Sequence, residues 1–210
     1  MSVNVWNRLA KKYDSLWVQK YSLAPTRKKV IEVIKNLKVG NNFCLLDFGC
    51  ATGQLIEELL KTYPNAKYAG FDKSIQMIKL ANSKILNCDF SVQNAENTNY
   101  QLNSFDIITC CHSFPYYNDK AIVVENINNI LKNNGYAIFV QASINNLYDK
   151  IIMSVVEKTA EKADYLSKSN FKKLFESKFE IIEEFEIKEK FFMPTLAGFV
   201  MRKKSENITD

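Results

Sequence analysis

The chain has 210 residues, of which 47% are hydrophobic and 12% aromatic, and its formal net charge is +5. This size and composition indicate one globular domain with a sizeable core, and no apolar run reaches the length of a membrane span. Arginine, the usual residue for paired hydrogen bonds to bases and phosphates, occurs only at positions 8, 27 and 202, so no nucleic-acid partner is expected.

The N-terminal part predicts two amphipathic helices before any strand. Apolar residues recur at helical spacing over residues 4–20 and again from Val30 to Leu37, and we expect Pro25 to break the chain between them. Residues 1–20 lack the uninterrupted apolar run of a signal peptide. The whole chain, residues 1–210, is expected to be a single domain. It consists of an N-terminal helical cap (1–40), a cofactor-binding core (41–143), C-terminal helices and closing strands (144–204) and a tail (205–210).

The stretch Leu45–Gly53 is predicted to be a strand that ends in a glycine-containing turn. The strand is apolar from Phe43 onward, as buried parallel strands are, and apolar residues at helical spacing follow Gly53. Strand, tight turn and helix in this order are typical of a nucleotide-binding α/β fold. The missing side chain of Gly49 is expected to let a ligand approach the backbone, while the helix N-terminus aims N–H groups at that ligand.

This ligand is not predicted to be a dinucleotide. The G-x-G-x-x-G fingerprint would place glycines at positions 51 and 54, which hold Ala51 and Gln54. A second apolar strand ends in Asp72, about twenty residues past the turn, which is the distance expected for a carboxylate that accepts hydrogen bonds from ribose hydroxyls. Ser74 is a good N-cap for the helix that follows.

The remainder of the chain continues the alternation of strands and helices and then closes with two strands. Asp119 is expected to cap a helix that carries Ile122 on its apolar face. Further helices are predicted at 145–163 and 167–176. The other predicted strands are Cys88–Val92, Phe105–Cys110, Tyr136–Ala142, Phe179–Lys190 and Thr195–Arg202.

Two motifs carry a resemblance to a known family. Asp47-x-Gly49-x-x-x-Gly53 and Asp72-x-Ser74-x-x-Met77 resemble the first and second motifs of class I S-adenosylmethionine-dependent methyltransferases. The chain looks closest to the small-molecule branch that includes quinone-biosynthesis enzymes. The resemblance implies an α/β fold with a doubly wound, mostly parallel seven-stranded sheet and an N-terminal helical cap.

The same resemblance implies the cofactor, S-adenosylmethionine, its product S-adenosylhomocysteine, and a set of cofactor-binding residues. In that family the counterpart of Met77 packs on the adenine, and the counterpart of Tyr13 reaches the amino-acid end. Asn94 stands where the family often has Asp, and its amide oxygen can also accept from the adenine amino group. The expected cofactor-binding residues are Tyr13, Asp47, Gly49, Cys50, Ala51, Gly53, Asp72, Lys73, Met77, Asn94, Ala95, Glu96, Cys111 and His112.

The loop after the fourth strand is the expected meeting point of the acceptor and the methyl group, because such loops line the ligand crevice of parallel sheets. His112, the only histidine, is the candidate catalytic base, and a contact to the cofactor through its backbone is the alternative. No metal site is predicted. Five aromatic residues are expected either to line the acceptor pocket or to pack in the core: Tyr116, Tyr117, Tyr148, Phe191 and Phe192.

The predicted activity is methyl transfer to an oxygen, nitrogen or carbon atom of a small molecule. The alternatives are a cofactor-binding protein without turnover, in a regulatory or subunit role, and a nucleic-acid methyltransferase, for which the N-P-P-Y loop is missing. The five cysteines form no C-x-x-C pair, which fits free thiols in a reducing cytoplasm. A monomer or homodimer without membrane attachment is expected.

Overall fold

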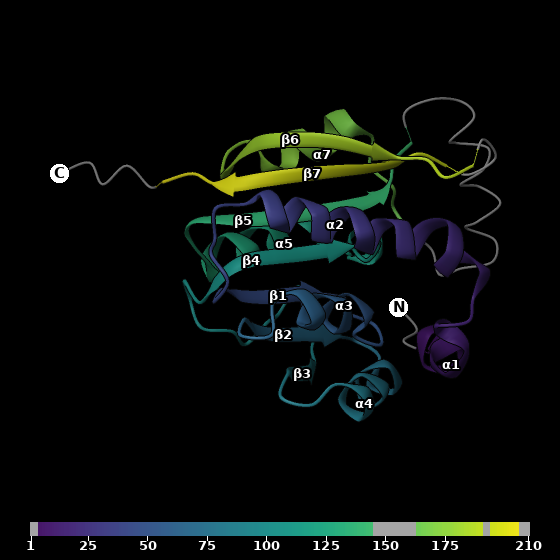
Figure 1. Ribbon diagram of the computed structural model, residues 1–210. Coiled ribbons are helices and arrows are strands. Elements are labelled where there is room, and N and C mark those ends of the chain that lie inside the picture. The colour runs from purple at the N-terminus through teal and green to yellow at the C-terminus, as the bar shows by residue number, and fades with distance from the viewer. Residues whose placement is uncertain (1–3, 145–162, 191–193, 206–210) are drawn as a thin grey trace.

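The computed structural model describes residues 4–144, 163–190 and 194–205 (Figure 1). The helix predicted at 145–163 falls almost entirely outside these residues, as do Tyr148, Phe191, Phe192 and most of the tail. None of the helices within the described part has the length and apolarity of a membrane span.

A seven-stranded sheet in the order β3-β2-β1-β4-β5-β7-β6 forms the centre of the molecule. Strands β1 to β5 run parallel, and β7 is antiparallel to both β5 and β6. This topology confirms the predicted doubly wound, mostly parallel sheet. The strands are Cys44–Phe48 (β1), Lys67–Asp72 (β2), Asp89–Val92 (β3), Phe105–Cys111 (β4), Leu131–Ala142 (β5), Phe179–Ile187 (β6) and Leu196–Lys203 (β7).

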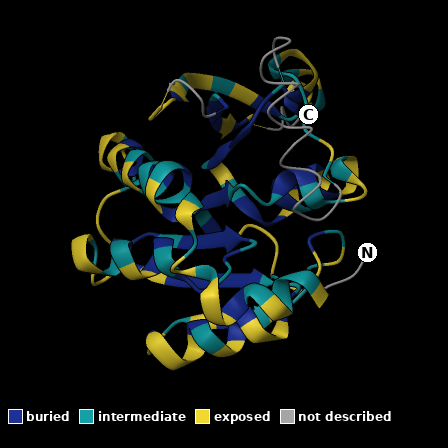
Figure 2. Ribbon diagram, turned by 90° about the vertical axis from the view of Figure 1, so that its right-hand side faces the viewer, coloured by how far each residue is buried: buried dark blue, intermediate teal, exposed yellow. Residues whose placement is uncertain are grey.

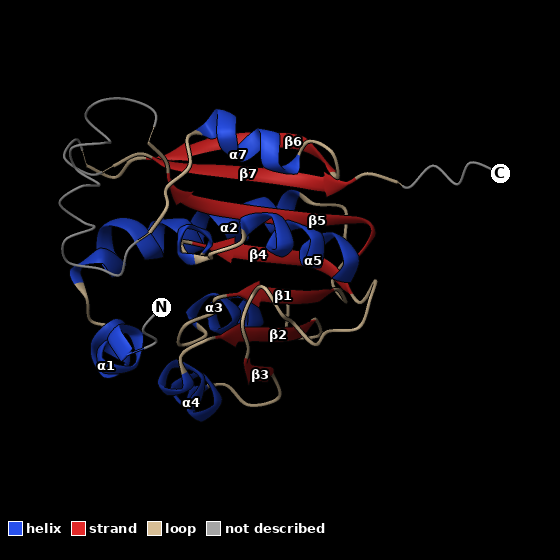
Figure 3. Ribbon diagram, turned by 180° about the vertical axis from the view of Figure 1, so that it is seen from behind, coloured by secondary structure: helices blue, strands red, loops and turns tan. Residues whose placement is uncertain are grey.

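Helices cover both faces of the sheet (Figures 1 and 3). Helices α2 (Ala24–Asn36), α3 (Gln54–Thr62) and α4 (Ile75–Lys84) contribute to one apolar cluster. Helices α5 (Lys120–Ile130) and α7 (Lys168–Phe175) contribute to the other. The central strands β1, β4 and β7 are almost entirely buried between the two layers, which explains why their sequences are mostly apolar (Figure 2).

The cap consists of helix α1 (Asn4–Tyr13) and a π-helical turn, η1 (Gln19–Leu23), that leads directly into α2. Figure 1 shows α1 beyond the ends of β1 and β4 to which their arrows point. Those ends are the carboxyl ends of parallel strands, where α/β proteins bind their ligands.

Three sequence expectations are corrected by the structure. Pro25 does not break the chain, because it lies in the first turn of α2, where its missing N–H costs no hydrogen bond. Ile122 is 46% exposed rather than buried, although Asp119 caps α5 as predicted. Strand β5 begins at Leu131, ahead of the predicted Tyr136, because a bulge extends its pairing with β4.

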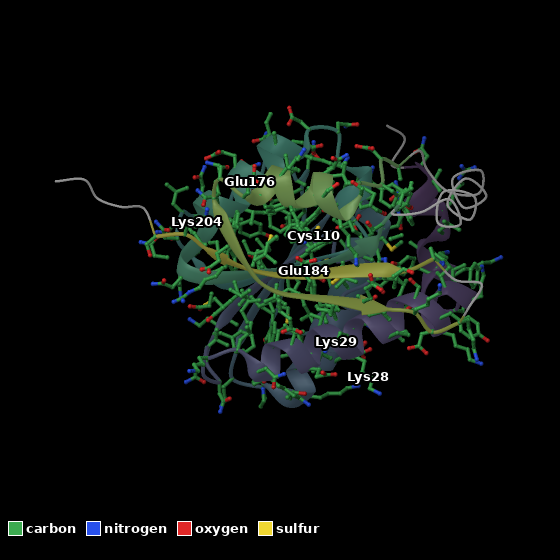
Figure 4. The ribbon with its side chains drawn as sticks, turned by 90° about the horizontal axis from the view of Figure 1, so that it is seen from above. Lys28, Lys29, Cys110, Glu176, Glu184 and Lys204 are labelled. Carbon is green, nitrogen blue, oxygen red and sulfur yellow. The ribbon has the colours of Figure 1, made fainter. Side chains whose placement is uncertain are left out.

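The end strand β6 carries a row of exposed glutamates, among them Glu184 (Figure 4). Lys172 of α7 forms an ion pair with Glu184, and Lys29 of α2 lies over the ring of Phe185. The charged residues of β6 therefore lie on the solvated side at the end of the sheet.

Candidate functional site

A cavity of about 50 Å³ lies between the turn after β1, helix α2 and the end of β4. It brings together residues that are far apart in the sequence but lie at the carboxyl ends of neighbouring strands. Among the residues that line it are seven predicted site residues: Tyr13, Asp47, Gly49, Cys50, Ala51, Cys111 and His112. The structure therefore brings these seven residues together at one cavity, and their role in binding the cofactor stays a prediction.

Helix α2 supplies two cavity residues that sequence reasoning missed, Thr26 and Arg27. Arg27 donates from Nε to Glu58 Oε1 at 2.7 Å and from Nη1 to the side-chain oxygens of Gln19 and Gln54, each at 3.0 Å. These bonds hold the guanidinium beside the cavity. The signal in the sequence that could have pointed to Arg27 is the rarity of arginine, since the chain has only three.

The turn after β1 has the left-handed backbone that its glycines indicate. Gly49 has φ +70° and Gly53 has φ +80°, and Ala51 between them adopts φ +47°. A Cβ atom at Gly49 would lie 2.4 Å from the Cβ of Ser113, so the glycine is needed for the loop after β4 to approach. Gly49 also lines the cavity, and the expectation that a ligand approaches its backbone stays a prediction.

Asp72 connects the two predicted motifs directly. Its Oδ2 accepts a hydrogen bond from the Ala51 amide at 3.1 Å, and its Oδ1 accepts one from the Ser74 amide at 2.8 Å. Burial raises the pKa of Asp72, and these two amides counteract that effect. Each carboxylate oxygen can accept a second hydrogen bond, so the side chain keeps capacity for a ligand.

Asp47, at the end of β1, is a second buried carboxylate at the cavity. Its Oδ1 accepts from Thr109 Oγ1 at 2.7 Å. Burial raises the pKa of Asp47 to about 7, and the Thr109 hydrogen bond opposes this rise. The carboxyl group is therefore able to gain or lose a proton near neutral pH.

His112 lies in a strained backbone conformation, with φ +62°, and its Nε2 is 2.8 Å from Thr26 Oγ1. Burial, aided by the nearby charge of Arg27, lowers its pKa to about 4. A base with so low a pKa is almost entirely deprotonated at neutral pH but has little affinity for a proton. The geometry therefore favours a positioning role over the predicted role as base.

We expect the imidazole of His112 to stay neutral between pH 8 and pH 5, because its pKa of about 4 lies below that window. The single histidine makes NMR a direct measurement: the Cε1–H resonance should not shift as the pH falls through 6.5, the usual histidine pKa. A free histidine-containing peptide serves as the control. A normal titration curve would contradict the buried contact with Thr26.

Polar contacts from the middle of helix α1 and from the residue just after it fasten the cap beside the site. Ser74 Oγ donates to Asn7 Oδ1 at 2.7 Å, which attaches the middle of α1 to the start of α4. Thr52 Oγ1 donates to Asp14 Oδ1 at 2.6 Å, and Lys84 forms an ion pair with the same carboxylate. The cap is thereby fastened to the turn after β1 and to both ends of α4.

Aromatic residues complete the closure. Trp6 of α1 packs edge-to-face on Tyr116, with ring centroids 5.4 Å apart, and Tyr13 extends into the cavity. Tyr116 belongs to η2 (Phe114–Tyr116), the short 3-10 helix after β4. Tyr13 is the residue of α1 that lines the cavity.

Comparison with known proteins agrees with this geometry. A family described as methyltransferase domain matches residues 45–135. Demethylmenaquinone methyltransferase of Thermotoga maritima is 27% identical over 142 residues, which are 67% of this chain and 61% of that protein. The uncharacterized protein MJ1252 of Methanocaldococcus jannaschii is 36% identical over 145 residues, 69% of this chain and 51% of its own.

Residues 45–135 carry a methyltransferase domain, similar to that of the Thermotoga maritima enzyme. A Haloferax volcanii protein solved with the Trm112 methyltransferase activator has the same fold, with a TM-score of 0.81 at 15% identity over 95% of this chain and 98% of that one. The chain spans about half to three-fifths of the length of the two curated relatives named above.

Other predicted residues of this methyltransferase lie outside the cavity lining and stay predictions. Gly53 packs against Ile85 and Phe90, and Met77 and Ala95 are buried. Glu96 accepts from the Asn118 amide at 2.8 Å. Two further residues in this group, Lys73 and Asn94, lie beyond the ends of β2 and β3 respectively.

The charges at the cavity fit the amino-acid end of S-adenosylmethionine, which carries a carboxylate and an ammonium group. Within the described part of the chain, Arg27 Nη2 has no hydrogen-bond acceptor and Asp47 Oδ2 has no donor. A cation and an anion with free capacity therefore line the same cavity. Arg27 is suited to the carboxylate, Asp47 to the ammonium group and Asp72 to the ribose hydroxyls.

Proposed function

We propose that this protein transfers the methyl group of S-adenosylmethionine to an oxygen, nitrogen or carbon atom of a small-molecule acceptor. The observation that carries the proposal is the direct bonding of Asp72 to the turn after β1, beside a cavity with paired opposite charges. The named relative from Thermotoga maritima, a demethylmenaquinone methyltransferase, supports a small acceptor.

The cofactor, when bound, supplies a methyl group already activated by its sulfonium charge. The protein's residues then have to hold the acceptor in line, and such positioning contributes about 7–11 kcal/mol in favourable cases. Trp6 and Tyr116 close the site above the loop after β4, which places aromatic surface beside the expected acceptor position. His112 is too weak a base to deprotonate an alcohol, so an acceptor that is readily deprotonated or already nucleophilic fits best.

Binding of the cofactor without turnover and methylation of nucleic acid are the two alternatives. Binding without turnover is tested by measuring the release of S-adenosylhomocysteine in the presence of a panel of small amines, phenols and quinols. Methylation of nucleic acid is tested by comparing that release with the release in the presence of RNA and DNA. Methylation of nucleic acid alone would contradict the proposal.

The direct test is calorimetry of S-adenosylmethionine with the Asp72→Asn variant. We expect its affinity to fall about 10- to 100-fold, because a hydrogen bond to a charged group is worth roughly 1.5–3 kcal/mol. Asp89→Asn, the same substitution at an exposed position on β3, is the matched control and should bind normally. Unchanged binding by Asp72→Asn, in a protein whose unfolding transition is intact, would overturn the assignment.

A further inference from the structure

A buried hydrogen bond joins helix α2 to the loop after β4. His112 Nε2 lies 2.8 Å from Thr26 Oγ1, and Thr26 is 1% exposed. Both residues line the cavity. The direction of this bond determines which form the neutral imidazole takes, because the ring carries its one proton on either Nδ1 or Nε2.

The hydroxyl proton of Thr26 indicates the direction of the bond. Among residues 4–144, 163–190 and 194–205, the acceptor available to that proton is His112 Nε2 and no other atom. A bond in the opposite direction, from Nε2–H to Oγ1, would leave a buried hydroxyl donor without a protein acceptor, which is costly. The geometry therefore favours donation by Thr26 to Nε2, with the ring proton on Nδ1.

The second ring nitrogen of His112, Nδ1, is open to a ligand. It has no hydrogen-bond partner in the part of the chain that the structure describes. It is also not sealed off by protein, since the one fully enclosed, unpartnered side-chain oxygen or nitrogen of that part is Gln141 Oε1. Because His112 lines the cavity, its Nδ1–H group is a donor that a molecule bound there can use.

Arg27 adds a second donor beside the first. It follows Thr26 directly in α2, it lines the same cavity, and its positive charge acts on His112. Its Nε and Nη1 groups bond side-chain oxygens of the protein, which leaves Nη2 as its unused donor in the described structure. Two neighbouring donors, one of them charged, suit a carboxylate, because each carboxylate oxygen accepts hydrogen bonds.

We propose that Thr26 is a positioning residue that fixes His112 in the Nδ1–H form, and that this N–H group joins Arg27 in binding the carboxylate of S-adenosylmethionine. The inference rests on the proposed function, because it concerns the cofactor of that reaction. It also gives the imidazole a role other than that of a base. The lone pair of Nε2 is occupied by Thr26 and Nδ1 already carries a proton, so neither nitrogen can take a proton from the methyl acceptor.

The first test is the protonation site of His112 in the free protein. Because the chain has one histidine, long-range proton–nitrogen correlation spectra of the isotope-labelled full chain show its two ring nitrogens without overlap. We expect Nδ1 to carry the proton in the wild type and in Thr26→Ser, which keeps the hydroxyl. Thr26→Val, which has a similar shape but no hydroxyl, should lose this preference. A proton on Nε2 in the wild type would overturn the proposal.

The second test is calorimetry with S-adenosylmethionine and with its decarboxylated form, which keeps the sulfonium and ammonium groups but lacks the carboxylate. We expect Thr26→Val to lower the affinity for S-adenosylmethionine about 3- to 10-fold, the contribution of one hydrogen bond. Its affinity for the decarboxylated compound should equal that of the wild type. Thr26→Ser should bind both compounds normally, as should the matched control Thr62→Val at an exposed position on α3.

The outcomes separate the two proposals. If the wild type binds neither compound, the proposed function fails, and this inference with it. If the wild type binds S-adenosylmethionine but Thr26→Val changes the two affinities equally, or changes neither, only the role of Thr26 and His112 is overturned. Should Thr26→Val fail to fold, the Nδ1–H resonance of the wild type replaces it: no shift on saturation with S-adenosylmethionine overturns the inference.

Discussion

Replacing Gly49 with alanine is expected to destabilise the protein by about 2–5 kcal/mol, the sum of a left-handed backbone for a non-glycine residue and overpacking of a buried site. The added Cβ atom would lie 2.4 Å from Ser113 Cβ and 2.7 Å from Ser113 Oγ. Ser113 cannot withdraw freely, because its hydroxyl donates to the Phe48 carbonyl at 2.7 Å and accepts from Tyr117. Chemical denaturation monitored by circular dichroism measures the loss.

Gly40→Ala is the matched control for this substitution. Gly40 has φ +69°, almost the same as Gly49, but no atom lies within 4 Å of the position that its Cβ would take. Gly40→Ala should therefore show only the backbone cost, about 1–2 kcal/mol. Equal losses in the two variants, with cofactor affinity reduced in Gly49→Ala alone, would mean that the space beside Gly49 serves the ligand after all.

Replacing Phe114 with alanine is expected to cost about 3–5 kcal/mol, as for other fully buried phenylalanines. Phe114 is the first residue of η2, and its ring packs against Phe139, Phe171 and Phe175. This contact anchors the loop that carries His112 and Ser113 to the core. The substitution should therefore lower the melting temperature and also weaken cofactor binding, since the loop forms one side of the cavity.

Phe179→Ala separates the two effects. Phe179 is also buried and belongs to the same aromatic cluster, but it lies on β6 and its ring packs against Phe175 rather than Phe114. We expect a similar loss of stability with cofactor affinity unchanged, both measured below the melting temperature of the less stable variant. If Phe114→Ala also binds normally, the loop does not depend on its aromatic anchor.

Features set by local sequence were predictable. The buried strand from Phe43 is continuously apolar, Ser74 and Asp119 cap their helices, and the spacing of Asp72 from Gly49 places the carboxylate at the same edge of the sheet. These follow from periodicity and from the rule that parallel strands end together.

Features set by tertiary packing were not predictable. Arg27 stands in a basic run whose other members, Lys28 and Lys29 (Figure 4), do not line the cavity. Its guanidinium reaches the site because α2 packs against the sheet with Arg27 on the side of the cavity. Similarly, Ser113 of the loop after β4 lies against Gly49, and His112 before it adopts a positive φ, which is unusual for a residue other than glycine.

The fastened position of α1 has a kinetic consequence. Asn7 and Asp14 tie this helix to the start of α4 and to the turn after β1, and its Tyr13 lines the cavity. We therefore expect that an adenosyl compound which takes the place of Tyr13 binds only after the helix has moved. In stopped-flow experiments the observed association rate should thus level off at high ligand concentration, at the opening rate of the helix. The same plateau should be reached with every adenosyl compound, whatever its affinity.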